Sequence, residues 1–578
     1  MTLLERVDSL EALRALPEGE LPALCAALRE EIISVCGRVG GHLGASLGAV
    51  ELVVALHRVF HSPQDALVFD VGHQAYAHKL LTGRRTRMHT LRQEGGIAPF
   101  LDPAESAHDA FGAGHACTAV SVALGMAEAL SSTDGLARAV AVVGDGGLTG
   151  GLTFEGLNNA GASPHPLVVV LNDNGMSISS NVGAVARLLQ SSAARSFFEA
   201  LGFSYLGPLD GHSFEALLPA LAEARRARRP VLVHVRTQKG RGFLPAEDDT
   251  ATRGHAMGPY ELRDGKLVRS RGARRTFSEA FALALEQAME ADERVVVVTP
   301  AMLEGSALSG LKARFPRRVH DVGIAEQHAV AFSAGLAARG RRPVCVLYST
   351  FLQRALDQLV HDVVLPGLPV TLGVDRAGLV GADGATHQGS YDVAWLRALP
   401  GLRLYAPVVG EDVQPMLATA LALPGPSAVR FPRGTLPEVP EGFAPSVAPV
   451  QGARWLLWPS SPRAVVVALG PLALEALLAA RTLSGVAVLD ARLFPLDAAA
   501  VQRALEVGTV VTVEEGTTKG GLGSAVLEEA ARTGRRARVR LLGLPDSFVR
   551  HGDARAQRHR LGLDADGIAQ ALASLLAE

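Results

Sequence analysis

Two apolar runs separated by a short helical segment decide the fold of this 578-residue chain. The first run, Ala139-Val-Ala-Val-Val143, leads into Gly144-Asp-Gly-Gly147. The second, Leu167-Val-Val-Val-Leu171, leads into Asn172-Asp-Asn174, and residues 153–160 lie between the two. Continuous runs of β-branched residues are typical of strands buried on both faces, as in parallel sheets covered by helices. We therefore predict a β-α-β unit over residues 139–174.

Similar runs recur along the rest of the chain and are separated by segments rich in Ala, Leu and Glu. This alternation predicts an α/β fold with mainly parallel sheets flanked by helices. Two stretches without a sustained period are interpreted as linkers and give three predicted domains, at residues 1–275, 276–447 and 448–578. The linkers are residues 236–276 and 432–454, and the further apolar runs are residues 231–235, 295–298, 344–347, 370–374, 464–468, 486–489 and 510–513.

Composition excludes several classes of protein. The chain has 56 Lys and Arg against 58 Asp and Glu, so its net charge of −2 predicts no bulk attraction to nucleic acid or to an anionic membrane. Its four cysteines are too widely spaced for a Cys-x-x-Cys site and indicate a reducing compartment. The apolar stretch 464–480 is interrupted by Gly470, Pro471 and Glu475, which argues against a membrane span. We expect a soluble, cytoplasmic protein.

The polar residues that follow the two opening runs predict a metal site. In a right-handed β-α-β unit the strands are parallel neighbours, so Asp145 and Asn174 would emerge at the same carboxyl edge of the sheet. Carboxylate and amide oxygens suit Mg²⁺, whose octahedron phosphate oxygens and water would complete. Gly146 and Gly147 would let the backbone approach those phosphates. A lone Gly-Asp-Gly is more often a turn, and the paired Asn-Asp-Asn is what favours the metal site.

These motifs resemble the thiamine-diphosphate site of transketolase-like enzymes and, more closely, the 1-deoxy-D-xylulose-5-phosphate synthase family. The resemblance covers essentially the whole chain in the same order and implies a transketolase-like fold. It also implies condensation of pyruvate with D-glyceraldehyde 3-phosphate, with loss of CO₂, to 1-deoxy-D-xylulose 5-phosphate for isoprenoid, thiamine and pyridoxal phosphate synthesis. The matching stretches are GHLGASLG at 41–48, DVGHQAY at 70–76, NDNGMSIS at 172–179, DVGIAEQH at 321–328, YSTFLQR at 348–354, DRAG at 375–378 and VRFPRG at 429–434.

The same resemblance implies how thiamine diphosphate and Mg²⁺ are bound. Asp145, Asn174 and the backbone carbonyl of Met176 would hold Mg²⁺ on the diphosphate. From its position alone, Glu326 is a charge in the first turn of a helix. In the family motif it becomes the carboxyl that hydrogen-bonds the aminopyrimidine ring and promotes formation of the nucleophile. The remaining cofactor residues would be His73, Gly114, His115, Ala116, Gly146, Gly147, Phe243 and Phe351.

Substrate residues follow from residue chemistry and from the resemblance. A single histidine is usually structural, but His42, His73, His255 and His387 lie in matching motifs and are candidates for steering protons. Arginine suits bidentate phosphate contacts, and Arg376 and Arg433 both follow apolar runs. The resemblance adds Tyr348, Arg354 and Asp383 to this phosphate pocket. It further implies a homodimer with the cofactor between the first and second domains of one chain.

Some features depart from the family pattern. The segment between Asn181 and Phe203 is shorter than in familiar members, either as a natural compact form or by deliberate removal, and we expect activity to be retained. Ala116 and Cys117 stand where the family often has two serines, and Phe243 where a tyrosine is common. The alternatives are a transketolase, the decarboxylase component of a 2-oxo acid dehydrogenase, or a non-catalytic, cofactor-binding regulatory homologue.

Overall fold

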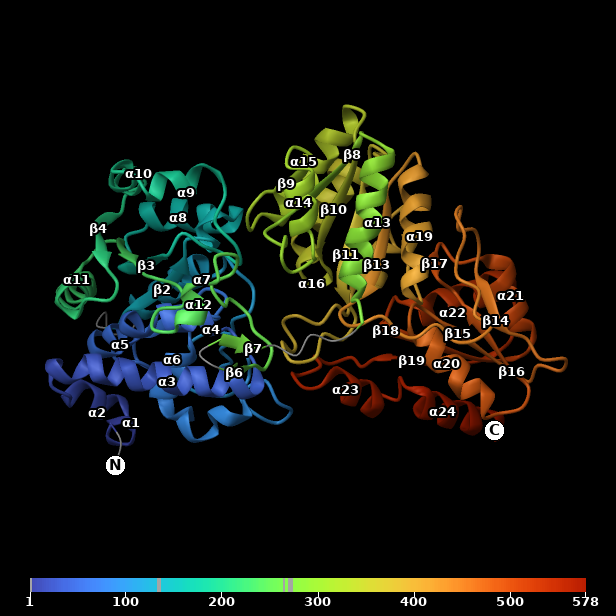
Figure 1. Ribbon diagram of the computed structural model, residues 1–578, viewed down its shortest axis with the longest axis horizontal. Helices are drawn as coiled ribbons and strands as arrows, with labels where there is room; N and C mark the ends of the chain where they lie inside the picture. Colours follow the sequence, from blue (N-terminus) through green and yellow to red (C-terminus); the bar gives the residue numbers. More distant parts are fainter. Residues whose placement is uncertain (1–2, 132–136, 264–265, 269–273, 578) are drawn as a thin grey trace. The chain divides into compact units, whose positions relative to one another are not determined.

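The structure is a computed structural model that describes residues 3–131, 137–263, 266–268 and 274–577 (Figure 1). The chain forms two compact units. The first comprises residues 1–271 with 323–325, and the second comprises residues 272–322 with 326–578. Residues 264–265 and 269–273 of the first predicted linker lie outside the described residues.

The first unit contains a five-stranded parallel sheet in the order β1-β2-β3-β5-β4. The predicted β-α-β unit is confirmed: β2 and β3 are parallel neighbours with Gly144 opposite Asn172, and helix α8 (Gly151–Ala162) connects them. This register brings the residues that follow the two strands to one edge of the sheet. The strands are β1 (Ala66–Phe69), β2 (Ala139–Gly144), β3 (Leu167–Asp173), β4 (Ser204–Asp210) and β5 (Val231–Arg236).

Strand β2 shows why the apolar runs are continuous. Val140 and Val142 pack into a core with residues of α3 (Leu21–Val39) and α5 (Val50–Val59). The alternate residues Ala141 and Val143 pack into a second core, with α7 (Ala119–Ser131) and α8. Because side chains alternate between the faces of a strand and both faces are covered, every position is apolar.

The second unit contains two mainly parallel sheets, in the orders β17-β12-β13-β11-β10-β8-β9 and β14-β16-β15-β18-β19. The pairs β12–β17 and β14–β16 are antiparallel and the others are parallel. The predicted α/β class is therefore confirmed. The strands are β8 (Val295–Thr299), β9 (Val319–Asp321), β10 (Arg342–Tyr348), β11 (Thr371–Ala377), β12 (Arg403–Tyr405), β13 (Ser427–Pro432), β14 (Arg454–Leu457), β15 (Ala464–Ala468), β16 (Val486–Asp490), β17 (Leu493–Phe494), β18 (Thr509–Thr517) and β19 (Arg538–Leu544).

Several details differ from a chain of domains joined by open linkers. Phe243, Met257 and Tyr260 lie within the predicted linker 236–276 and are buried in the core of the first unit. Leu493 and Phe494 form β17, which adds to the sheet of β8–β13 although they lie in the third sequence segment.

The apolar stretch 464–480 forms strand β15 and part of helix α20 (Leu472–Arg481), and no helix in the described ranges is long and apolar enough to cross a bilayer. The four cysteines, all among the described residues, are buried and form no disulfide with one another.

A buried ion pair joins two helices of the first unit to the loop after β5. Both Arg29 terminal nitrogens donate to the Glu51 carboxylate at 2.7 and 2.5 Å, and Arg29 Nε donates to the Arg241 carbonyl. His212 Nδ1 lies 3.0 Å from Glu51, and His212 Nε2 accepts the N–H of Gln238. Burial would raise the pKa of Glu51, but the hydrogen bonds from His212 and Arg29 lower it to about 2.

Replacing Glu51 tests this pair. The pKa of Glu51 is depressed in the folded state, so its stabilisation is complete above about pH 4.5 and is lost as the pH falls towards about 2. We expect Glu51→Gln to lower the free energy of unfolding by about 3 kcal/mol at pH 7, measured by urea unfolding, and by progressively less below pH 4.5. Exposed Glu155→Gln is the control and should change little. A Glu51→Gln loss that stays constant down to pH 3 would contradict this assignment.

Candidate active site

The carboxyl edge of the first sheet holds a buried carboxylate with one unused oxygen. Asp145 follows β2 directly, and its Oδ2 accepts a hydrogen bond from Asn181 Nδ2 at 2.6 Å. Its Oδ1 is buried and makes no hydrogen bond of ordinary geometry with the described residues, although the N–H groups of Asn174 and Gly175 act on the carboxylate. Burial, together with the nearby Asp173 carboxylate, raises the pKa of Asp145 to about 7. A buried acceptor of this kind fits a cation, which would restore the charged form.

Asn174 follows β3 and opens a tight turn beside Asp145. Its Oδ1 accepts the N–H of Met176 at 3.1 Å, and Met176 and Ser180 form an isolated bridge. The N–H of Asn181 donates to the Gly175 carbonyl at 3.1 Å, which folds Asn181 back towards Asp145. An amide oxygen has two lone pairs, so Asn174 can still accept a ligand contact. No cluster of three His, Cys, Asp or Glu side chains suited to a metal occurs in the described ranges, and the predicted Mg²⁺ set is of another kind.

The two glycines after Asp145 are required by the protein's own packing. A Cβ on Gly146 would lie 2.7 Å from Ser177 Cβ, and a Cβ on Gly147 would lie 2.4 Å from Asp70 Oδ2. Asp70 in turn accepts the N–H groups of Cys117, Thr118 and Ala119 at 2.9, 3.1 and 3.2 Å. Close approach of Asp70 therefore fixes both the Gly147 turn and the start of α7, which follows the predicted cofactor residues Gly114, His115 and Ala116.

Three of the predicted histidines form one buried cluster in the first unit. The ring centroids of His42, His73 and His255 are 5.4 to 6.3 Å apart. Burial, with a smaller effect of Lys239, lowers the pKa of His73 to about 3 and that of His255 well below its ordinary value. Nδ1 of His73 and of His255 has no hydrogen-bond partner among the described residues. These two imidazoles are therefore neutral and can accept a hydrogen bond.

Lys239 is a site residue that the sequence reasoning missed. Its Nζ donates to the Ser177 carbonyl at 2.7 Å, in the turn between Asn174 and Asn181. Burial lowers the pKa of Lys239 to about 7, and the Asp145 carboxylate opposes that shift. Two features of the sequence could have drawn attention to Lys239: the chain has only five lysines, and this one stands in a Gly-rich stretch.

The predicted cofactor residue Phe243 lies four residues after Lys239. Its ring packs against the Tyr260 ring, with centroids 6.0 Å apart.

In the second unit, Glu326 begins helix α15 (Glu326–Ala338) but is buried, with a residue exposure of 3%. Burial raises its pKa, and Arg354, whose Nη1 is 3.6 Å from Oε2, opposes that rise. Oε2 forms no hydrogen bond to the described residues. A charge that serves only to stabilise the first turn of a helix has no need of burial, so this carboxyl is suited to bind a ligand group.

The predicted substrate residues of the second unit gather around Tyr348. The Arg376 guanidinium lies 3.9 Å from the centre of the Tyr348 ring, and Phe351 stacks on that ring at 5.6 Å. Burial raises the pKa of Tyr348 to about 12, and Arg376, Asp375, Arg433 and Asp383 all act on it electrostatically. The remaining contacts join Arg433 Nη1 to Asp383 at 3.0 Å and the Phe351 ring to the His387 ring at 5.6 Å. Arg354, by contrast, faces Glu326.

Arg376 is held in an unusual backbone conformation. Its φ of 56° lies in the left-handed region that non-glycine residues rarely adopt. The buried Asp375 carboxylate accepts the Arg376 N–H at 2.7 Å and hydrogen bonds from Ser278 and Ser306. Strain of this kind persists where surrounding contacts fix it, so Asp375 fixes the direction of the Arg376 side chain.

Comparison with known proteins accounts for these motifs together. The family model described as 1-deoxy-D-xylulose-5-phosphate synthase matches residues 4–197 and 190–237. The transketolase pyrimidine-binding domain matches residues 273–439, and the transketolase C-terminal domain matches residues 455–568. Among solved structures, transketolase from Leishmania mexicana is 18% identical, with 97% of this chain and 98% of that chain covered and a TM-score of 0.47.

Curated relatives match this chain over its full length, and one of them is equally short. A 1-deoxy-D-xylulose-5-phosphate synthase from Myxococcus xanthus is 69% identical over 576 residues, covering 100% of this chain and 99% of its own. One from an Anaeromyxobacter species is 50% identical over an alignment of 630 positions, covering 100% of this chain and 98% of its own. The two matches to the 1-deoxy-D-xylulose-5-phosphate synthase model overlap at residues 190–197, within the segment predicted to be short. The Myxococcus protein has nearly the same total length as this chain. This chain belongs to the 1-deoxy-D-xylulose-5-phosphate synthase family.

Proposed function

We propose that this chain is a transferase that condenses pyruvate with D-glyceraldehyde 3-phosphate, with loss of CO₂, to give 1-deoxy-D-xylulose 5-phosphate. The family membership supports the reaction. The structural observation that carries the proposal is the buried Glu326 carboxyl, which retains an oxygen without a hydrogen bond to the described residues. Thiamine diphosphate, when bound, supplies the electron sink that decarboxylation requires. The product would enter isoprenoid, thiamine and pyridoxal phosphate synthesis.

We propose cofactor-binding residues within each unit, taken by itself. From the first unit, Asp145, Asn174 and the Met176 carbonyl would hold Mg²⁺, supported by the unused Oδ1 of Asp145. Lys239 would add positive charge for the diphosphate, because its amine lies beside this turn. Glu326 would bind the aminopyrimidine ring. The other proposed cofactor residues are His73, Gly114, His115, Ala116, Gly146, Gly147, Phe243 and Phe351.

The substrate residues have separate proposed roles. Arg376 and Arg433 would bind the acceptor phosphate, with Tyr348 and Asp383 orienting the two guanidinium groups. Arg354 would orient Glu326 through their 3.6 Å ion pair. His42, His73, His255 and His387 would steer protons during the condensation, a role supported for the first three by the clustering of their rings.

The organisation of the protein is also proposed. We propose domains at residues 1–275, 276–447 and 448–578, supported by family matches that fall at 4–237, 273–439 and 455–568. A homodimer in the cytoplasm, with no nucleic-acid or membrane partner, completes the proposal.

The first test is the reaction itself. The purified protein, given pyruvate, D-glyceraldehyde 3-phosphate, thiamine diphosphate and Mg²⁺, should release CO₂ and form 1-deoxy-D-xylulose 5-phosphate in equal amounts. Acetaldehyde release without the deoxyketose phosphate would contradict the synthase, and ketol transfer between sugar phosphates would favour a transketolase.

A second test addresses Glu326. Glu326→Gln removes the carboxyl, so turnover should fall about a hundredfold or more, while calorimetry should show thiamine diphosphate still bound. Glu411 is the matched control, because it is an exposed glutamate in the first turn of helix α19 (Gly410–Ala422). Glu411→Gln should retain turnover. Equal losses in both variants would reduce Glu326 to a helix-stabilising charge.

A further inference from the structure

A long irregular segment of the first unit carries several of the proposed cofactor residues. After the 3₁₀ helix η3 (Arg85–Thr90), residues 91–118 form no helix or strand before α7 begins. The segment contains Phe100, whose ring lies 5.2 Å from that of His42, and Gly114, His115 and Ala116. Segments of this length inside a compact domain need tertiary contacts to hold one conformation.

Two carboxylates in the segment each bind a backbone N–H seven residues earlier. Glu105 Oε1 accepts the N–H of Ala98 at 2.8 Å. Asp109 Oδ2 accepts the N–H of Asp102 at 2.9 Å. These two hydrogen bonds from backbone N–H groups to side-chain carboxylates hold the conformation of residues 98–109. They take the place of the regular backbone hydrogen bonds of a helix or sheet.

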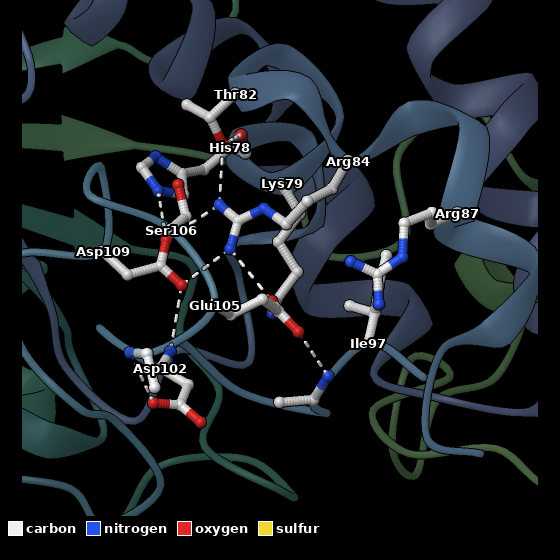
Figure 2. A network of polar contacts seen from close by, with 12 residues as sticks. His78, Lys79, Thr82, Arg84, Arg87, Ile97, Asp102, Glu105, Ser106 and Asp109 are labelled. Atoms are coloured by element: carbon white, nitrogen blue, oxygen red, sulfur yellow. Dashed lines mark hydrogen bonds and ion pairs between the residues drawn. The ribbon is translucent and has the colours of Figure 1, made fainter. Parts of the chain in front are cut away.

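The same carboxylates fasten the segment to the chain that follows β1 (Figure 2). Arg84 donates to Asp109 through Nη1 and Nη2 at 2.7 and 2.8 Å, and to Glu105 through Nη1 at 3.0 Å. Lys79 Nζ donates to Glu105 at 2.5 Å, and His78 Nε2 lies 3.0 Å from Asp109. Lys79 and Arg84 belong to the continuous segment of helix α6 (Tyr76–Lys79) and η2 (Leu80–Arg84), which begins three residues after His73.

The charges in this network are buried and balanced. Two carboxylates face the two cations Lys79 and Arg84, and the side chains of His78, Lys79 and Asp109 have no exposed surface. Burial lowers the pKa of His78 to about 4, so it donates to Asp109 as a neutral ring. Burial would raise the pKa of Asp109, but the hydrogen bonds from His78 and Arg84 hold it well below its ordinary value. Loss of Glu105 would leave the buried Lys79 without its hydrogen-bonded carboxylate, and loss of Asp109 would leave Arg84 with Glu105 alone.

We propose that Asp109 and Glu105 are positioning residues for the cofactor-binding turn Gly114–Ala116. They would also position Phe100, whose ring packs against the ring of His42. The link is short: the N–H of Ala113 donates to the Leu101 carbonyl at 3.0 Å, and Asp70 binds the N–H groups of residues 117–119. Residues 110–116 are thus held at one end by Asp109 and at the other by Asp70. This inference rests on the proposed function, since it concerns binding of thiamine diphosphate.

The test compares two buried aspartates of the same unit. Asp65 accepts the N–H groups of His61 and Arg138 and pairs with Arg225, but it precedes β1 at the opposite edge of the sheet. Asp109→Asn and Asp65→Asn therefore remove the same charge from similar surroundings. Thiamine diphosphate affinity, with Mg²⁺ present, is measured by calorimetry on the cofactor-free full chain. Hydrogen exchange of residues 98–116 and the melting temperature are measured on the same samples.

We expect Asp109→Asn to weaken thiamine diphosphate binding about tenfold or more and to speed amide exchange at Asp102 and across residues 110–116. Asp65→Asn should lower the melting temperature without either effect. If Asp109→Asn does not fold, Glu105→Gln, which leaves the Arg84–Asp109 pair intact, should show the same pattern at smaller size. Unchanged affinity in a folded Asp109 or Glu105 variant would overturn the inference. Failure of the unaltered protein to bind thiamine diphosphate would instead overturn the proposed function.

Discussion

The parallel register of β2 and β3 is the constraint on which the first unit's site depends. Both strands are buried on both faces, so their side chains are apolar up to the carboxyl ends, where Asn172 and Asp173 are the first polar residues of β3. The register then places the ends together, with Gly144 opposite Asn172. Asp145 and Asn174, which follow at once, meet at a single edge. Apolar packing along the strands thus determines where the polar residues of the candidate site lie in this unit.

The buried carboxylates of the protein fall into two kinds according to their hydrogen bonds. Asp70, Asp109 and Glu51 are surrounded by donors and hold segments of chain in place. Asp145 and Glu326 each keep an oxygen without a hydrogen bond to the described residues, as do Asp490 and Glu514, although Arg354 forms an ion pair with that oxygen of Glu326. An unused oxygen alone is therefore insufficient to define a site, and Glu326 is set apart by its place in the matching stretch DVGIAEQH at 321–328. What distinguishes Asp145 is its position at the carboxyl edge beside Asn174 and Lys239.

The sequence predicted those parts of the molecule that local pattern controls. The β-α-β unit, its carboxyl edge and the strands of the later sheets follow from runs of apolar residues. Lys239 and the Asp109–Arg84 network could not be predicted in this way. Lys239 and Asp109 lie in segments without a regular spacing of apolar residues, and they meet their partners only through tertiary packing. The two-residue strand β17 is too short to show a pattern. Family resemblance, rather than periodicity, pointed to Glu326, whose burial the structure then revealed.

We propose that the unused oxygen of Asp145 is a magnesium ligand on which cofactor binding depends. It is tested most directly by titrating the cofactor-free protein with thiamine diphosphate at increasing Mg²⁺ concentrations, for the unaltered chain and for Asp145→Asn. We expect Mg²⁺ to strengthen binding to the unaltered protein by about tenfold or more, and we expect Asp145→Asn to lose this dependence while remaining folded. An equal Mg²⁺ dependence in the two proteins would contradict it.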